Sequence, residues 1–193
     1  MSDRKLILFI AASLDGYIAT ETDDLSFLSL VEHNGEDYGY TKFISTVDTV
    51  IMGRKTFDWV KNHTTEFPHS GKETYIITHQ KRPDIGKTVF YGGNIKDLVL
   101  GLKSRKGKNI FCDGGAELVD LLLKENLIDE IVLSLIPVLL GTGKRLFRDG
   151  RTMQNIHLAE SRSYPSGLVQ LHYLFTDDKS NHNRKNKLNV ISH

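Results

Sequence analysis

The chain has 193 residues, of which 39% are hydrophobic and 25% charged, and its formal net charge is +1. This length allows one well-buried core and is short for two, and the composition is that of an ordinary globular protein. The near-zero charge gives no electrostatic reason to expect nucleic acid or a membrane surface as a partner, and a single cysteine, Cys112, excludes an internal disulfide and a cysteine-based metal cluster.

The N-terminal segment carries Arg4 and Lys5 before an apolar run, an order that superficially resembles a signal peptide. The run from Leu6 to Ala12 is short and leads directly into a turn, which favours a first strand instead. No segment approaches the roughly 18 apolar residues that a membrane span requires. We therefore expect a cytoplasmic protein without a membrane partner.

Strand and helix patterns alternate along the rest of the chain. Apolar runs and alternation predict strands, and apolar residues at helical spacing predict helices. The predicted strands cover residues 5–13, 48–53, 74–78, 88–92, 109–113, 128–140, 154–164 and 168–176. The predicted helices cover 36–47, 54–60, 94–104 (capped by Asn94) and 115–125, and 62–73 is predicted to be a polar loop.

This alternation predicts an α/β fold with a largely parallel sheet and right-handed crossovers. The last two strands, joined at Pro165-Ser166-Gly167, predict a closing antiparallel hairpin. We expect one domain over residues 1–176 and a polar tail over 177–193. The composition of the tail predicts disorder, and the alternative is that Leu188, Val190 and Ile191 dock on the body or on a partner chain.

Three strand ends carry residues suited to an anion, and ligands of open parallel sheets bind beyond the carboxyl ends of the strands. At Gly53-Arg54-Lys55-Thr56, helix N-terminal amides, a guanidinium, an ammonium and a hydroxyl together favour a phosphate site; the alternative is a helix start with solvated cations. At Gly114-Gly115 the missing side chains would let a phosphate approach the backbone, although a tight turn also needs glycine.

The third strand end, Thr78-His79-Gln80, offers polar groups but taken alone is more typical of an ordinary turn. Three such ends in one short domain favour an extended ligand with several phosphates, such as a dinucleotide. The adjacent cations Arg54 and Lys55 would suit the extra phosphate of its 2′-phosphorylated form. The sequence thus predicts a phosphorylated dinucleotide rather than a simple anion.

Several better-known motifs are excluded. The chain lacks the G-x-G-x-x-G fingerprint after its first strand, which argues against a standard Rossmann site. The segment "LLGTGKRLF" has Val138 and Arg145 where a P-loop needs Gly and Ser or Thr. The eight histidines show no ligand spacing, so no metal is expected.

Five segments resemble, in order, the motifs of the dihydrofolate reductase superfamily. They are "LILFIAASLDGYIA", "DTVIMGRKTFDW", "TYIITHQ", "IFCDGGAELVDLLL" and "LIPVLLGTGKRLF". The branch that this chain resembles contains stand-alone bacterial proteins similar to the C-terminal reductase domain of the bifunctional riboflavin-biosynthesis deaminase-reductase. The resemblance covers about Lys5 to Thr176 and implies an eight-stranded, mostly parallel sheet in a three-layer fold with flanking helices and an antiparallel C-terminal hairpin.

The resemblance implies hydride transfer from NADPH to a heterocyclic C=N bond or to an opened ribosylamine. It places Arg54, Lys55 and Thr56, after Gly53, on the pyrophosphate and the 2′-phosphate, with Thr78 and His79 beside the latter. It also places Gly114, Gly115, Ala116 and Glu117 along the pyrophosphate, and Ala11, Ala12 and Ile18 beside the nicotinamide. Relatives are often dimers, so a homodimer is also implied.

Two acidic residues are candidates for the substrate end. Folate reductases carry a pterin-binding carboxylate on the helix before the "MGR" strand, and counting back from Gly53 places Asp37 there. A buried carboxylate would pair with an aminopyrimidine through two charge-assisted hydrogen bonds, and the alternative is an acidic residue at a helix start. Asp15 could orient the substrate or form the turn with Gly16.

Some residues depart from the riboflavin enzymes. Tyr17 stands where those usually have Lys or Arg, the "MGRKTF" form is unusual among them, and no zinc deaminase domain accompanies this chain. We therefore expect an NADPH-dependent reductase of a pterin- or aminopyrimidine-like small molecule. The alternatives are the 5-amino-6-(5-phosphoribosylamino)uracil reductase of riboflavin biosynthesis and a non-catalytic NADPH-binding sensor.

Overall fold

The computed structural model describes residues 4–175 and builds one eight-stranded sheet, in the order β5-β4-β3-β6-β1-β7-β10-β9. Neighbouring strands from β5 (Thr88–Tyr91) through β4 (Glu73–Ile77), β3 (Val47–Gly53), β6 (Asn109–Gly114) and β1 (Leu6–Ser13) to β7 (Glu130–Ile136) pair in parallel. β10 (Val169–Phe175) pairs antiparallel with β7 and with β9 (Ile156–Ser163). The predicted mostly parallel sheet and closing hairpin are therefore confirmed.

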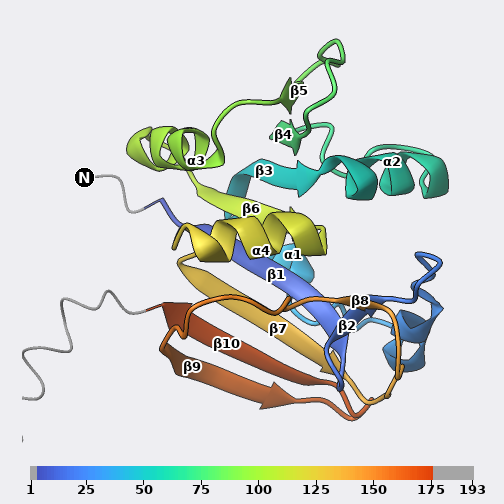
Figure 1. Ribbon diagram of the computed structural model, residues 1–193. Helices are drawn as coiled ribbons and strands as arrows, with labels where there is room; N and C mark the ends of the chain where they lie inside the picture. Colours follow the sequence, from blue (N-terminus) through green and yellow to red (C-terminus); the bar gives the residue numbers. More distant parts are fainter. Residues whose placement is uncertain (1–3, 176–193) are drawn as a thin grey trace, which may run out of the picture.

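Helices cover both faces of the sheet, which gives the three layers that were predicted. α3 (Ile95–Ser104) and α4 (Ala116–Lys124) pack with Leu6, Leu8 and Cys112 in the largest core cluster. α1 (Tyr40–Ser45) and α2 (Arg54–His63) pack on the opposite face. Figure 1 shows α4 across the front of β6 and β1, with α1 behind β1.

Strand alternation divides the central strands between these two layers. On β1, Leu6 and Leu8 belong to the core under α3 and α4, whereas Phe9 packs with Phe43 of α1. On β6, Cys112 lies in the first core and Phe111 in the second. Cys112 is a small core residue, fully buried, and burial raises the pKa of its thiol to about 12.

Two predicted elements were too long. The helix predicted over 36–47 begins only at Tyr40, because Tyr38 (φ 54°) and Gly39 (φ 79°) adopt left-handed backbone conformations that a helix cannot include. The strand predicted over 128–140 ends at Ile136, because Pro137 follows and has no amide to donate to the ladder.

Two short elements, a 3-10 helix and the strand β8, were not predicted. The 3-10 helix, η1 (Ser26–Val31), buries Phe27 and Val31 against Ile136 and Leu168. β8 (Lys144–Arg145) pairs antiparallel with β2 (Tyr17–Ala19) and is too short to show an apolar pattern. Both new elements lie beside the carboxyl end of β1, so they bear directly on the site.

The predicted tail, residues 177–193, and the domain boundary at 176 lie outside the described residues. Between residues 4 and 175, no helix has the length and apolar character needed to cross a bilayer.

Candidate active site

A cavity of about 1210 Å³ lies at the carboxyl ends of β1, β3, β4 and β6. Parallel strands end at the same edge of a sheet, so the three predicted anion-friendly strand ends meet in this one cavity. Eleven predicted site residues line it: Ala11, Ile18, Gly53, Arg54, Lys55, Thr56, Thr78, His79, Gly115, Ala116 and Glu117.

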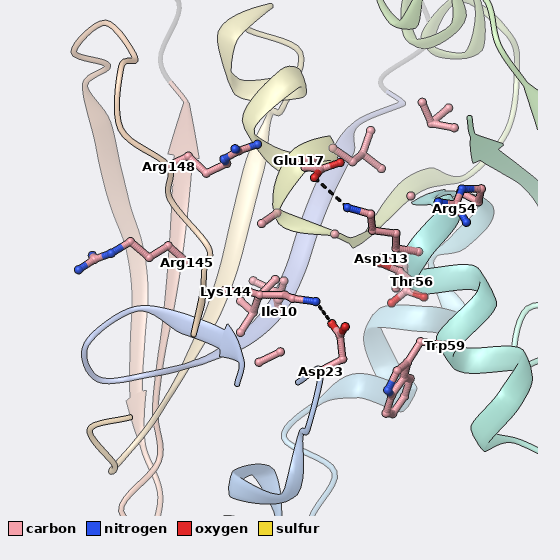
Figure 2. Close-up of a pocket in the computed structure, with 18 of the residues that line it drawn as sticks. Ile10, Asp23, Arg54, Thr56, Trp59, Asp113, Glu117, Lys144, Arg145 and Arg148 are labelled. Atoms are coloured by element: carbon pink, nitrogen blue, oxygen red, sulfur yellow. Dashed lines mark hydrogen bonds and ion pairs between the residues drawn. The ribbon is translucent and has the colours of Figure 1, made fainter. Parts of the chain in front are cut away.

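We call the part formed by Gly53–Thr56, Thr78–His79, Gly115–Glu117 and Arg148 the cationic end. The apolar end is formed by Phe9, Leu25, Leu28 and Trp59, together with the carboxylate of Asp113. In Figure 2, Arg54, Glu117 and Arg148 lie toward one side of the cavity and Trp59 toward the other.

The β3–α2 junction supplies two cations. α2 begins at Arg54, directly after Gly53, which has an extended backbone (φ −73°, ψ 150°) and gives the helix no side-chain cap. Arg54 Nη1 donates to Asp58 Oδ2 at 2.8 Å, and Arg82 pairs with the same carboxylate at 2.7 Å. Hydrogen bonds from Arg82 and then Arg54 lower the pKa of Asp58, so this carboxylate stays ionised and holds the Arg54 side chain.

The β6–α4 junction lies directly beside the first one. Gly115 has φ +91°, and a Cβ atom there would stand 2.9 Å from Thr56 Oγ1 and 3.8 Å from Gly53 Cα. Both the backbone conformation and the close approach therefore require glycine at this position. The N-termini of two helices, α2 and α4, therefore lie close together and both border the cavity.

The donor chemistry of this volume fits a phosphate-bearing cofactor. Three kinds of donor here are ones that bind phosphates in other proteins. They are the amides at the start of α4, the amides at the start of the ten-residue α2, and the Lys55 ammonium. Lys55 Nζ meets Glu117 Oε1 at 3.1 Å with both side chains 70% exposed, an ion pair marked by the dashed line at Glu117 in Figure 2. An exposed pair of this kind is worth only about 0–1 kcal/mol, so an incoming phosphate can replace the carboxylate as the partner of Lys55.

Thr78 and His79 complete the cationic end from the end of β4. The amide of Thr78 donates to Tyr91 O at 3.0 Å, and its hydroxyl oxygen accepts the amide of Gln80 at 3.0 Å. These bonds fix the turn after β4 and leave the His79 side chain beside the cavity. The turn interpretation and the ligand interpretation of this segment are therefore compatible.

Cations of the long β7–β9 connection also border the cavity, and sequence reasoning did not select them. Figure 2 shows Arg148 pointing toward Glu117, Lys144 pointing toward Asp23, with which it forms an ion pair, and Arg145 pointing away. Arg145 instead lies over the Tyr17 ring, with its guanidinium carbon 5.0 Å from the ring centroid. Lys144 and Arg145 stand in the segment "LLGTGKRLF", and Arg148 follows it directly.

The apolar end offers flat surfaces for a ring. Trp59 of α2 stacks on His63 with ring centroids 4.1 Å apart, which holds the indole in a fixed orientation. Leu25 and Leu28, at and within η1, face the cavity with Phe9 of β1. Apolar walls with a few polar groups are typical of sites for heterocyclic small molecules.

Asp113 is the carboxylate in the cavity wall near the apolar end. It stands one residue before the end of β6, its side chain is 24% exposed, and its Oδ2 lies 2.8 Å from Nε2 of His69. His69 comes from the loop after α2 and is only 4% exposed. Burial, and then the charge of Asp113, raise the pKa of Tyr40 to about 12, so the Tyr40 hydroxyl stays protonated.

Asp37, the predicted substrate carboxylate, is exposed and is not part of the cavity lining. Its two oxygens accept the amides of Gly39 and Thr41, each at 2.9 Å. Hydrogen bonds from the Thr41 side chain, and then from these amides, lower its pKa. The geometry matches the alternative interpretation, an acidic residue at the start of a helix, and a substrate role for Asp37 stays an untested prediction.

Asp15 also lies outside the lining. Its carboxylate accepts the Ser13 hydroxyl at 2.6 Å and the amides of Leu140 and Gly141 at 3.1 and 2.7 Å. The Ser13 bond, assisted by these amides, lowers its pKa. Asp15 thus ties the β1–β2 turn to the β7–β8 loop, and a role in orienting the substrate stays an untested prediction.

Two further predicted residues, Ala12 and Gly114, are buried and do not line the cavity. Ala12 lies in the core under α3 and α4, while its neighbour Ala11 borders the cavity. Gly114 has φ +100°, and a Cβ there would stand 3.4 Å from Ile10 Cδ1. It therefore contributes to the backbone turn between β6 and α4 rather than to the cavity wall.

Comparison with known proteins places the chain among riboflavin-type reductase domains. The model of the RibD C-terminal domain family matches residues 4–170. The uncharacterized proteins YwjB and YyaP of Bacillus subtilis (strain 168) are 40% identical over 175 residues and 32% identical over 184 residues. These matches cover 89% and 90% of this chain, and 98% and 96% of the two relatives.

Solved structures agree with the fold. One is a Shewanella sp. PV-4 protein, whose name assigns it provisionally to riboflavin biosynthesis. It is 30% identical with a TM-score of 0.82, and the match covers 90% of this chain and 99% of that one. Dihydrofolate reductase from Enterococcus faecalis, solved with NADP(H) and RAB-propyl, is 15% identical with a TM-score of 0.65, covering 90% and 97%. The second likeness confirms a dihydrofolate-reductase-like fold.

Proposed function

The chain belongs to the family of the RibD C-terminal domain, and from this premise we propose that it is an NADPH-dependent reductase. Its substrate in this proposal is a pterin- or aminopyrimidine-like small molecule with a C=N bond. The observation that carries the proposal is the cavity that joins a cationic end to an apolar end bordered by the Asp113 carboxylate.

At the cationic end, Arg54, Lys55 and Thr56 and the amides at Gly115–Ala116 would bind the cofactor phosphates. Arg54, which Asp58 orients, would face the additional phosphate that distinguishes NADPH from NADH. When bound, this cofactor supplies the hydride for the reduction. Ala11 and Ile18 are small or apolar lining residues that leave room for a flat ring between the two ends.

At the apolar end, Trp59, Leu25 and Leu28 would hold the substrate ring, and Asp113 would hydrogen-bond its nitrogen atoms. One oxygen of Asp113, Oδ2, already lies 2.8 Å from His69 Nε2, and the other could make a hydrogen bond to a ring nitrogen of the substrate. Asp113 takes the role here that the sequence had suggested for Asp37. It does so because it alone of the two lines the cavity.

A second candidate is reduction of the phosphoribosylaminouracil intermediate of riboflavin biosynthesis. Two observations favour it: the name of the Shewanella relative, and Lys144, which lines the cavity close to Asp23 and could meet a substrate phosphate. The sensor alternative predicts cofactor binding without turnover, so the same assays separate it.

The test combines binding and turnover. We expect NADPH to raise the Tm of the full chain more than NADH does at equal concentration, because the ligand that binds more tightly stabilises the folded state more. A ligand at 100 times its Kd raises the free energy of unfolding by about 2.7 kcal/mol. We then expect loss of the reduced-nicotinamide absorbance with dihydrofolate, a dihydropterin or the riboflavin intermediate. Failure of both cofactors to stabilise the protein would contradict the reductase, and stabilisation without turnover on any of the three favours the sensor.

A further inference from the structure

His69 is a buried, titratable side chain that the proposed function has not used. It lies in the loop between α2 and β4, is 4% exposed, and its Nε2 lies 2.8 Å from Asp113 Oδ2. The edges of two rings enclose it, with centroids at 5.5 Å for Phe67 and 5.8 Å for Phe111. An imidazole held in an aromatic pocket thus touches the cavity only through the Asp113 carboxyl.

The other ring nitrogen of His69 has no partner. Among the described residues, nothing hydrogen-bonds to the buried Nδ1 atom. Leaving a buried polar atom unpaired destabilises the folded state, because the atom gives up its hydrogen bonds to water. An apolar ring would fill this space without leaving a polar atom unpaired. The presence of histidine is therefore explained by its contact with Asp113 rather than by packing.

The surroundings of Asp113 leave His69 as its proton partner. The titratable groups that the structure places against Asp113 are His69, Tyr40 of α1 and Cys112 of its own strand. Burial, with Asp113 as the second cause, raises the pKa of Tyr40 to about 12, and burial raises that of Cys112 to about 12. Both therefore stay neutral near neutral pH, and neither exchanges a proton with the carboxyl.

We propose that His69 is a positioning residue that keeps one proton shared with Asp113, so that this carboxyl can deliver it into the cavity. Histidine is the side chain that gains and loses a proton near neutral pH. The 2.8 Å separation of His69 Nε2 and Asp113 Oδ2 lets one proton be shared between the two groups.

This inference rests on the proposed function, because it concerns reduction of a C=N bond. The carbon accepts the hydride, the π electron pair moves to nitrogen, and nitrogen takes a proton from the Asp113 O–H. The pair is left as a carboxylate and a neutral imidazole. Once the product has left, solvent returns the proton through the open side of the Asp113 carboxyl, which is 24% exposed.

The first test needs no substrate. The full chain with ¹⁵N-labelled histidine rings is titrated by NMR between about pH 5 and pH 9, as wild type and as Asp113→Asn. We expect the pH dependence of the His69 ring signals to differ between wild type and Asp113→Asn, because the variant removes the carboxylate that His69 Nε2 contacts. An unchanged His69 titration overturns the proposal.

The chain offers a matched internal control. His172 Nε2 lies 2.8 Å from Glu130 Oε2 on β10 and β7, outside the cavity lining. Its titration should be the same in wild type and Asp113→Asn. A joint shift of His69 and His172 would indicate a global change in structure and would also overturn the assignment of the effect to the pair.

The second test compares the pH profiles of NADPH oxidation for wild type, His69→Asn and His172→Asn. We expect the ratio of wild-type to His69→Asn turnover to grow about tenfold between pH 5.5 and pH 8, with the KM for NADPH within twofold. A ratio that is constant with pH means lost packing only and overturns the proposal. Cofactor binding without turnover on any substrate contradicts the proposed function and leaves the NMR titration to decide the shared proton.

Discussion

The cationic and apolar ends of the cavity are built in different ways. At the cationic end, all groups except Arg148 come from the end of a strand and the helix or turn that directly follows it, as at Gly53–Thr56 and Gly115–Glu117. At the apolar end, Asp113 of β6 meets His69 of a loop and Tyr40 of α1, which come from distant parts of the sequence. In the proposed function, local sequence therefore encodes the cofactor-binding groups, while the sheet order assembles the substrate side.

This difference leads to separable effects of mutation. Changes at the cationic end should alter cofactor affinity, and changes at the apolar end should alter turnover at nearly constant cofactor affinity. Four variants test that separation.

Asp113→Asn should have the largest effect. Removing the proposed acid should lower turnover by about 100-fold or more, since general acid–base groups contribute about 10²–10⁴. The Kd for NADPH, measured by calorimetry, should stay within threefold. Asp37→Asn is the matched control: it removes a carboxylate that caps helix α1 outside the cavity, so turnover should stay within twofold. The reverse order of these two effects would restore Asp37 as the substrate carboxylate.

Gly115→Ala should weaken the cationic end next. Its Cβ would stand 2.9 Å from Thr56 Oγ1 at a left-handed backbone, and such strain costs about 1–3 kcal/mol. We expect a lower Tm and a loss of NADPH affinity of about tenfold. Gly35→Ala is the control, because Gly35 has a similar φ of +83° with nothing within 4 Å of its Cβ position. Equal NADPH affinities in the two variants would show that the two junctions do not form the phosphate site.

Arg54→Ala should distinguish the two cofactors. Hydrogen bonds to charged groups contribute about 1.5–3 kcal/mol, so NADPH affinity should fall about tenfold or more and NADH affinity less than threefold. Arg82→Ala is a suitable control, because Arg82 shares the Asp58 partner but does not line the cavity. Equal weakening of NADPH and NADH would place Arg54 on the pyrophosphate alone.

Glu117→Gln should have the smallest effect and the opposite sign. The variant frees Lys55 from its exposed ion pair and removes a negative charge beside the phosphates. We expect NADPH affinity to rise about two- to threefold, measured at low ionic strength and diminishing with added salt. Weaker NADPH binding would mean that Glu117 itself contacts the cofactor.

The same contrast shows why some features could be predicted from the sequence. The alternation of strands and helices predicted the sheet, its closing hairpin and most of the element bounds, because burial periodicity is local. Gly114-Gly115 and Arg54-Lys55 could be selected for the same reason, since each pair stands directly at the end of a strand, where glycines and cations together favour an anion. Their convergence on one cavity followed from parallel strands ending at one edge.

Asp113 and His69 could not be selected in this way. Asp113 stood inside the "FCDGG" segment, but its partner lies 44 residues away in a loop predicted to be polar. Asp37 was preferred by counting residues back from Gly53, and such counting cannot register that Tyr38 and Gly39 are left-handed and move the helix start to Tyr40. Contacts made by loops depend on the assembled fold rather than on local patterns.

We propose that this cavity binds a phosphorylated nicotinamide dinucleotide through Arg54 and the two glycine-flanked junctions. The decisive measurement is calorimetric titration of the wild-type chain with NADPH and, separately, with NADH. We expect NADPH to bind with one-to-one stoichiometry and a Kd about tenfold or more below that of NADH. No binding of either cofactor, or equal affinity for both, would contradict it.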